Sequence, residues 1–146
     1  MPAWVDEGYS EYARRMPREC RLVLNEIPLA RRSKSQVVER AVKEEGQRML
    51  AALPDRQQVI ALDVKGRSWS TEQLANQLDV WRQDGRDVSL LVGGPDGLAA
   101  ECLQRADQTW SLSALTLPHP LVRVVLAEQL YRAWSLNSGH PYHRAG

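Results

Sequence analysis

The stretch that decides the fold is residues 88–119, VSLLVGGPDGLAAECLQRADQTWSLSALTLPH. It begins with the apolar run 88–92, whose length and β-branched ends predict a strand buried on both faces of a parallel sheet. The run stops at residues 93–97, GGPDG, where glycine lets the backbone turn, adopt a positive φ and approach a ligand closely. A second apolar run, 112–117, ends before Pro118 and is predicted as another strand. Two predicted strands that stop at glycine or proline, one before residue 93 and one before Pro118, predict a ligand pocket at their ends.

Outside this stretch, strands and helices alternate along the chain. Ser70 and Gln73 form a capping-box pattern that predicts the start of one helix, and Gly85 follows its predicted end. Apolar spacing predicts helices over 6–16, 35–53, 70–84 and 120–136, and further strands over 21–28 and 58–64. This alternation predicts an α/β domain of three layers with a mostly parallel sheet.

Composition sets limits on the class of protein. A chain of 146 residues fits a single domain over 1–146, and its 43% hydrophobic and 25% charged residues are typical of a globular protein. The net charge is only +1, so a polyanionic partner would have to be bound by a local patch. Cys20 and Cys102 lack metal-site spacing and do not suggest disulfides. With no apparent signal peptide or membrane span, we expect a protein of the reducing cytoplasm.

One segment is locally basic. Between positions 14 and 34 the sequence contains seven cationic residues and only two acidic ones, Glu19 and Glu26. The seven are Arg14, Arg15, Arg18, Arg21, Arg31, Arg32 and Lys34. Such a run is either a solvated surface or a phosphate-contacting patch, and composition does not decide between them.

The last predicted helix, 120–136, is apolar around nearly its whole circumference. Its apolar residues are Leu121, Val122, Val124, Val125, Leu126, Leu130, Tyr131, Ala133 and Trp134. A helix of this kind must be buried on two sides, which predicts a homodimer unless a neighbouring helix covers the second side.

Several familiar catalytic motifs are missing. The sequence has no GxxxxGK[ST] loop, no GxGxxG before a helix, no GxSxG and no HExxH. The histidines His119, His140 and His143 lack a carboxylate at a metal-binding spacing, so no metal is predicted.

Motifs along the chain nevertheless resemble one family. The segments LLVGGPDGL, WSLSALTLPHPLVRVVLAEQLYRAWS and NSGHPYHR occur in order, preceded by PAWVDEGYSEYARR, KEEGQRML and ALDVKGRSWS. Together they resemble the SPOUT-class pseudouridine N3-methyltransferases of the ribosomal large subunit, over essentially the whole chain. Members of that family begin with a further strand that this chain lacks, so we expect an exposed sheet edge and reduced stability.

The resemblance implies a carboxyl-terminal trefoil knot that binds S-adenosylmethionine, a topology that periodicity cannot reveal. It places the cofactor against backbone groups and apolar side chains of two strand ends and of Leu62. The implied cofactor-binding residues are Leu62, Gly93, Leu112, Ser113, Ala114, Leu115, Thr116 and Leu117. Without the resemblance, 112–117 would be interpreted as a core strand.

Methyl transfer requires the nucleophile in line with the donor, and N3 of pseudouridine must also lose its proton. The candidates for a base or for a cation that stabilises the anionic ring are His119, Arg132, Tyr142, His143 and Arg144. The resemblance implies that the tail crosses to the partner subunit's cofactor. Arg132 could instead pair with Glu128 four residues earlier, and His143 could contact phosphate or belong to a disordered terminus.

The implied substrate is a pseudouridine in a loop of large-subunit rRNA on the ribosome, where unstacked bases are accessible. The tryptophans Trp4, Trp69, Trp110 and Trp134 could stack on such bases or could belong to the core. Two other hypotheses remain: a non-catalytic RNA- or ribosome-binding protein with a vestigial pocket, and a SPOUT methyltransferase that acts on tRNA.

Overall fold

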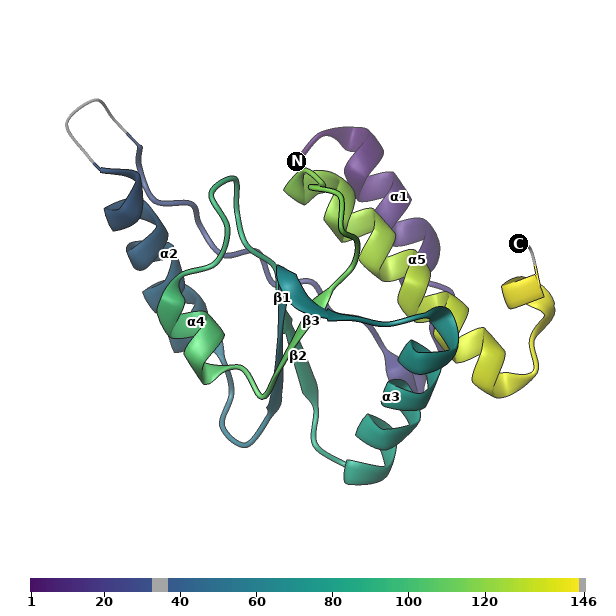
Figure 1. Cartoon of the computed structure of the whole chain (residues 1–146). Helices are drawn as coiled ribbons and strands as arrows, with labels where there is room; N and C mark the ends of the chain where they lie inside the picture. Colours follow the sequence, from purple (N-terminus) through teal and green to yellow (C-terminus); the bar gives the residue numbers. More distant parts are fainter. Residues whose placement is uncertain (33–36, 145–146) are drawn as a thin grey trace. The chain divides into compact units, whose positions relative to one another are not determined.

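A computed structural model describes residues 1–32 and 37–144, and the side chains of His143 and Arg144 lie outside that description (Figure 1). The elements in chain order are α1 (Ala3–Ala13), η1 (Arg18–Cys20), α2 (Val38–Ala52), β1 (Gln58–Ser68), α3 (Thr71–Asp84), β2 (Val88–Leu91), α4 (Ala100–Arg105), β3 (Gln108–Ser111), α5 (His119–Ser138) and η2 (Pro141–Arg144). The chain forms two compact units. The helical unit comprises Met1–Leu24, Trp69–Gly85 and Pro120–Gly146, and the sheet unit comprises Asn25–Ser68 and Arg86–His119.

The sheet unit contains three parallel strands in the order β2-β1-β3. The central strand β1 is hydrogen-bonded on both edges and carries the fully buried residues Val59, Ile60 and Ala61. Parallel strands end at the same edge of a sheet, so the segments that follow β2 and β3 leave it on the side reached by Leu62. The predicted α/β class with a parallel sheet is confirmed.

Helices α2 and α4 pack on the sheet through one apolar cluster. Val59, Leu91, Ala99 and Cys102 are buried, and side chains of α2 such as Met49 pack against them. A Cβ at Gly46 would lie 2.5 Å from the Cβ of Ala99, so glycine is what allows α2 to approach the amino end of α4 closely. Burial raises the pKa of the Cys102 thiol, which is consistent with a packing role.

The edge between β1 and β3 contains an irregularity. Trp110 is registered with Leu62 and again with Arg67, so residues 63–66 leave the ladder between these pairings. A Cβ at Gly66 would lie 2.7 Å from the backbone of Thr109 and Trp110. Only glycine can occupy this position without displacing β3.

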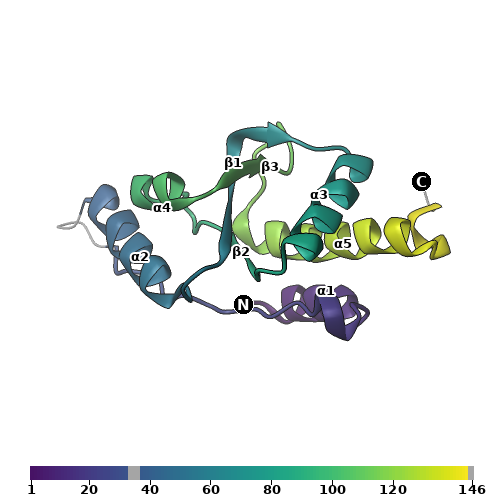
Figure 2. The same ribbon diagram turned by 90° about the horizontal axis from the view of Figure 1, so that it is seen from below.

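In the helical unit, α1 lies alongside α5 (Figure 2). A Cβ at Gly8 would be 3.2 Å from Val124, and the Asn137 side-chain amide donates to the Ala75 carbonyl at 2.9 Å, which ties α5 to α3. Helix α3 has the predicted capping box between Ser70 and Gln73, and Gly85 ends it with φ of +84°. Helices α1 and α3 of the same chain therefore contact α5. Such contacts were expected if a neighbouring helix, and not a second subunit, covers the other side of this helix.

Three strand predictions need correction. Residues 21–28 form no strand and Val23 is 68% exposed, because no strand in the described residues pairs with them. Residues 112–117 are an irregular loop, since the ladder position beside β1 is filled by the preceding β3 with its buried Trp110. Strand β2 lies at an edge, so Val88, Ser89 and Leu90 are only half-buried.

Candidate functional site

The predicted cofactor-binding residues all belong to the sheet unit and lie at one edge of its sheet. Leu62 is half-buried in β1, Gly93 follows β2, and the loop from Leu112 follows β3. The chain runs from β1 to β2 on one side and then places β3 on the other side of β1. In open parallel sheets, such a reversal of strand order opens a crevice outside the carboxyl ends of the strands, where ligands bind.

The first wall of this edge is the turn 93–97. The Gly97 amide donates to the Gly94 carbonyl at 3.1 Å, and Gly97 has φ of +85°. A Cβ at Gly93 would lie 2.6 Å from the carbonyl carbon of Gly97. The two arms of the turn thus touch backbone to backbone. The sharp turn and the positive φ predicted for GGPDG are confirmed.

The second wall is the loop 112–117. Ser113 accepts a hydrogen bond from the Leu115 amide through its hydroxyl at 3.0 Å and from the Ser111 hydroxyl through its carbonyl at 3.0 Å. These local side-chain bonds compete with a strand ladder. Ala114, Leu115 and Thr116 are exposed, and Leu112, Ser113 and Leu117 are half-buried. Within the described chain, residues 113–117 make no backbone-to-backbone hydrogen bond outside regular elements.

This arrangement fits S-adenosylmethionine, the cofactor that the resemblance implies. Apart from the Leu115 amide, which donates to Ser113, the backbone amides and carbonyls of residues 113–117 can hydrogen-bond an adenine. Leu62, Leu112 and Leu117 offer half-buried apolar side chains. At Gly93 the direction that a Cβ would take is filled by the backbone of Gly97, so this glycine is needed for the shape of the turn itself. The residues therefore suit recognition through the backbone.

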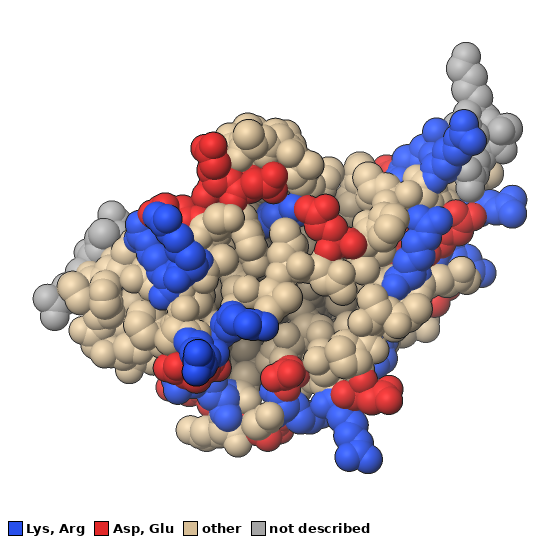
Figure 3. All heavy atoms as spheres, turned by 180° about the vertical axis from the view of Figure 1, so that it is seen from behind, with Lys and Arg blue, Asp and Glu red and all other residues tan. Residues whose placement is uncertain are grey.

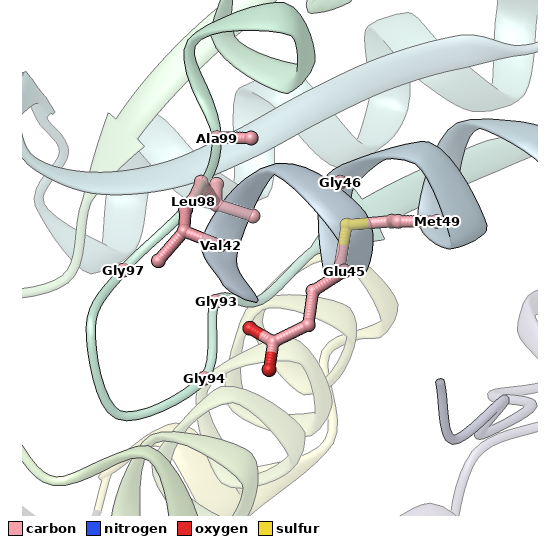
Figure 4. A pocket seen from close by; sticks show the side chains of 9 residues that line it. All are labelled: Val42, Glu45, Gly46, Met49, Gly93, Gly94, Gly97, Leu98 and Ala99. Atoms are coloured by element: carbon pink, nitrogen blue, oxygen red, sulfur yellow. The ribbon is translucent and has the colours of Figure 1, made fainter. Parts of the chain in front are cut away.

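Behind the turn lies a small cavity between α2 and the segment 93–99 (Figure 4). It encloses only about 10 Å³, which is space for about one water molecule. It is lined by Val42, Glu45, Gly46, Met49, Gly93, Gly94, Gly97, Leu98 and Ala99. The cavity is too small for a cofactor, and we call this side of the turn, which faces α2, its back.

A charged network on that side of the turn was not predicted from the sequence. Glu45 is 8% exposed and accepts from the Arg32 guanidinium at 2.6 and 3.1 Å, while Arg32 also donates to Asp96 at 2.7 Å. The Arg32 hydrogen bonds hold the pKa of Glu45 below its ordinary value, and Glu45, followed by Asp96, raises that of Arg32. The available signal was a carboxylate four residues after Ala41 and four before Met49, in the apolar stripe of α2.

Arg132 on α5 and the predicted catalytic residues of the tail belong to the helical unit. Arg132 donates to Glu128 at 2.9 and 2.6 Å, which confirms the pairing that its spacing allowed. The Tyr142 hydroxyl also reaches Glu128, at 3.2 Å, and its ring centroid is 4.7 Å from that of Tyr131. Burial, followed by hydrogen bonding with Tyr12, raises the pKa of Tyr142, so its phenol keeps its proton at neutral pH. Arg132 and Tyr142 thus share Glu128 as a hydrogen-bond acceptor.

The other predicted catalytic residues are not joined to this group by the described contacts. His119 is the half-buried first residue of α5 and belongs to the sheet unit. The side chains of His143 and Arg144 fall outside the described residues. Their roles stay predictions.

The basic segment is partly neutralised by its own neighbours. Arg14 and Arg15 both pair with Glu11, and Arg32 belongs to the network with Glu45. Arg18, Arg21 and Arg31 are exposed, while Lys34 lies outside the described residues. On the face drawn in Figure 3, cationic and acidic side chains are interspersed. Phosphate contact by the exposed arginines stays a prediction.

The tryptophans divide between core and surface. Trp110 is buried, Trp69 and Trp134 are half-buried, and Trp4 is 55% exposed. Only Trp4 therefore presents much of its ring to solvent in this structure. Among the described residues, no cluster of three or more metal-ligating side chains occurs, and no helix has the length and apolarity needed to span a membrane.

Comparison with known proteins gives consistent matches. A family model described as "Predicted SPOUT methyltransferase" matches residues 1–143. The ribosomal RNA large subunit methyltransferase H of Marinomonas sp. (strain MWYL1) is 60% identical over 144 residues, which cover 99% of this chain and 93% of the relative. The protein of the same name from Methylococcus capsulatus (strain ATCC 33009 / NCIMB 11132 / Bath) is 58% identical with the same coverage.

Proposed function

Because the chain belongs to the SPOUT methyltransferase family, we propose that it transfers a methyl group from S-adenosylmethionine to N3 of a pseudouridine in large-subunit rRNA. The observation that carries the proposal is the edge formed by Leu62, the turn 93–97 and the loop 112–117, which suits backbone recognition of this cofactor. The names of the two relatives support large-subunit rRNA as the substrate. The trefoil knot of the family and action on ribosomes in the cytoplasm belong to the same proposal.

The bound cofactor supplies an electrophilic methyl group on a sulfonium. The turn 93–97 and the loop 112–117 orient it, so that the target nitrogen can approach in line. The N3 proton must pass to a base, which is a side chain or water, and a cation can stabilise the anionic ring that this leaves. His119 and His143 are the proposed bases, and Arg132 and Arg144 the proposed cations. Tyr142, whose raised pKa keeps the phenol protonated, acts as a hydrogen-bond donor.

We further propose a homodimer in which the tail of one chain completes the site of its partner. Half-buried apolar residues along α5 support this, because Leu121, Val122 and Val125 keep part of their surface after packing within the chain.

The experiment measures transfer of a labelled methyl group from S-adenosylmethionine into assembled ribosomes, isolated large subunits and bulk tRNA. We expect label in large-subunit rRNA, at an N3-methylated pseudouridine identified by mass spectrometry. Label in tRNA alone would support the tRNA alternative. Absence of both transfer and cofactor binding by calorimetry would support the non-catalytic RNA-binding alternative.

A further inference from the structure

Arg32 connects three segments of the sheet unit that are distant in sequence. Its guanidinium donates to the Ala30 carbonyl at 3.1 Å, to the Glu45 carboxylate of α2 and to the Asp96 carboxylate of the turn. The Ala30 amide also donates to Glu45, at 2.9 Å. Figure 4 shows the Glu45 carboxylate projecting from α2 toward the turn. The guanidinium is thus fixed by the buried Glu45 and in turn restrains the turn through Asp96.

The turn has few restraints of its own. Three of its five residues are glycines, which have the most conformational freedom to lose when a chain becomes ordered. One backbone hydrogen bond, from Gly97 to Gly94, closes it. Within the described residues, the bond from Arg32 to Asp96 is the only side-chain hydrogen bond that ties residues 93–97 to another segment. Loss of that bond should widen the set of conformations that the turn samples.

The partner of Arg32 on α2 is fixed more firmly. Glu45 accepts from both terminal nitrogens of Arg32, a paired geometry that restricts rotation of the guanidinium. The nitrogen that reaches Asp96 is the remaining Nε. The planar group therefore transmits the position of α2 to the turn, and lysine, a point charge, could not make all these contacts.

We propose that Arg32 is a positioning residue for the methyl donor, acting through Asp96 to hold the turn 93–97 in the conformation that binds S-adenosylmethionine. The inference rests on the proposed function, since it assigns the front of the turn to the cofactor. Arg32 acts from the back of the turn and touches no reacting atom. Its effect should therefore appear in cofactor affinity and should leave the chemical step unchanged.

The test uses the full-length chain with Asp96→Asn, which removes the anionic partner at an exposed site and leaves the Arg32–Glu45 pair intact. The matched control is Glu44→Gln, which removes one negative charge from α2, where Glu44 lies 4.0 Å from Arg40 and Arg48. Calorimetry with S-adenosylmethionine should show Kd raised about threefold to tenfold in Asp96→Asn, as expected for loss of a partly exposed ion pair that preorganises a site. Glu44→Gln should bind as the wild type does.

Further readouts separate positioning from a purely structural role. In Asp96→Asn, KM for the cofactor should rise while kcat at saturating cofactor and the melting temperature match those of Glu44→Gln. Asp96→Glu, which keeps the carboxylate, should recover part of the affinity. Equal cofactor affinity in Asp96→Asn and Glu44→Gln would overturn the inference while leaving the proposed function intact. A wild-type chain that fails to bind the cofactor would overturn both.

Discussion

At the scale of single residues, Glu45 makes stability depend on pH. Its pKa is lowered in the folded protein, chiefly by hydrogen bonds from Arg32, so its contribution is complete above the unfolded value of 4.5. That contribution is lost as the pH falls through the folded pKa, because below the unfolded value the unfolded chain binds a proton that the folded carboxylate does not. We expect the free energy of unfolding to decrease with acidification below about pH 4.5, and Glu45→Gln to flatten this decrease.

Urea unfolding at a series of pH values measures this effect. Glu44→Gln is the control, because it removes a carboxylate from the same helix without touching Arg32. Parallel pH profiles for wild type and Glu45→Gln would show that the Arg32–Glu45 pair contributes nothing to acid sensitivity.

Gly66 is a second residue whose replacement should be costly. Because an added Cβ would lie 2.7 Å from the backbone of Thr109 and Trp110, Gly66→Ala must displace β3 or bend β1. We expect a loss of about 2 kcal/mol in the free energy of unfolding, as for overpacking elsewhere. Gly8→Ala is the comparison, since its Cβ would meet only the Val124 side chain, at 3.2 Å. Equal stability of the two variants would contradict the argument.

Single residues also show where sequence analysis succeeds. The sequence GGPDG predicted a tight turn because glycine readily adopts a positive φ, as Gly97 does, and allows the close backbone contact seen at Gly93. The pairing of Arg132 with Glu128 was visible because helical spacing is local. The contacts of Arg32 with Glu45 and Asp96 were not visible, because they join residues 13 and 64 positions apart that only the fold brings together.

At the scale of elements, the amino end of α3 depends on its capping box. The Ser70 hydroxyl accepts from the Gln73 amide at 3.1 Å, and the Gln73 side chain accepts from the Ser70 amide at 2.8 Å. Ser70→Ala should lower the free energy of unfolding by about 1 kcal/mol. Thermal unfolding measures this loss, with Ser70→Thr, which keeps the hydroxyl, as the control. A Ser70→Ala variant as stable as Ser70→Thr would show that water replaces the cap at no cost.

Helices were predicted better than strands for a physical reason. A helix satisfies its own backbone hydrogen bonds, so caps such as Ser70 and stops such as Gly85 act locally. A strand needs a partner, and composition does not reveal which apolar run finds one. Residues 21–28 pair with no strand in the described chain, and residues 108–111 occupy the ladder position expected for 112–117.

At the scale of the whole molecule, the proposed dimer predicts that turnover depends on the tail. Removal of residues 142–146 deletes three candidate catalytic residues, Tyr142, His143 and Arg144, and with Tyr142 its contacts with Glu128 and Tyr131. We expect methyl transfer to fall by a hundredfold or more, about the size of a lost acid–base contribution, with cofactor Kd unchanged. Calorimetry and single-turnover assays separate the two effects. Unchanged turnover would remove the tail from the mechanism.

Mixing two defective chains tests whether the tail crosses between subunits. One chain lacks residues 142–146 and the other carries Gly93→Val, whose Cβ would collide with Gly97 at 2.6 Å and spoil the turn. A crossing tail gives mixed dimers one intact site and hence partial activity, whereas each chain alone stays inactive. No recovery in dimers verified by sedimentation would place the tail on its own subunit's cofactor. Neither a knot nor a crossing tail has a periodic signature, so both came from family resemblance alone.

The central position of β1 has a consequence for synthesis of the chain. Its residues, Gln58–Ser68, leave the ribosomal exit tunnel before either neighbour, and β3 follows only at Gln108–Ser111. Until then one or both edges of β1, with its apolar side chains, remain unpaired. An unpaired strand of this kind can bind chaperones or aggregate. The sheet can be completed only after residues 108–111 have also left the tunnel.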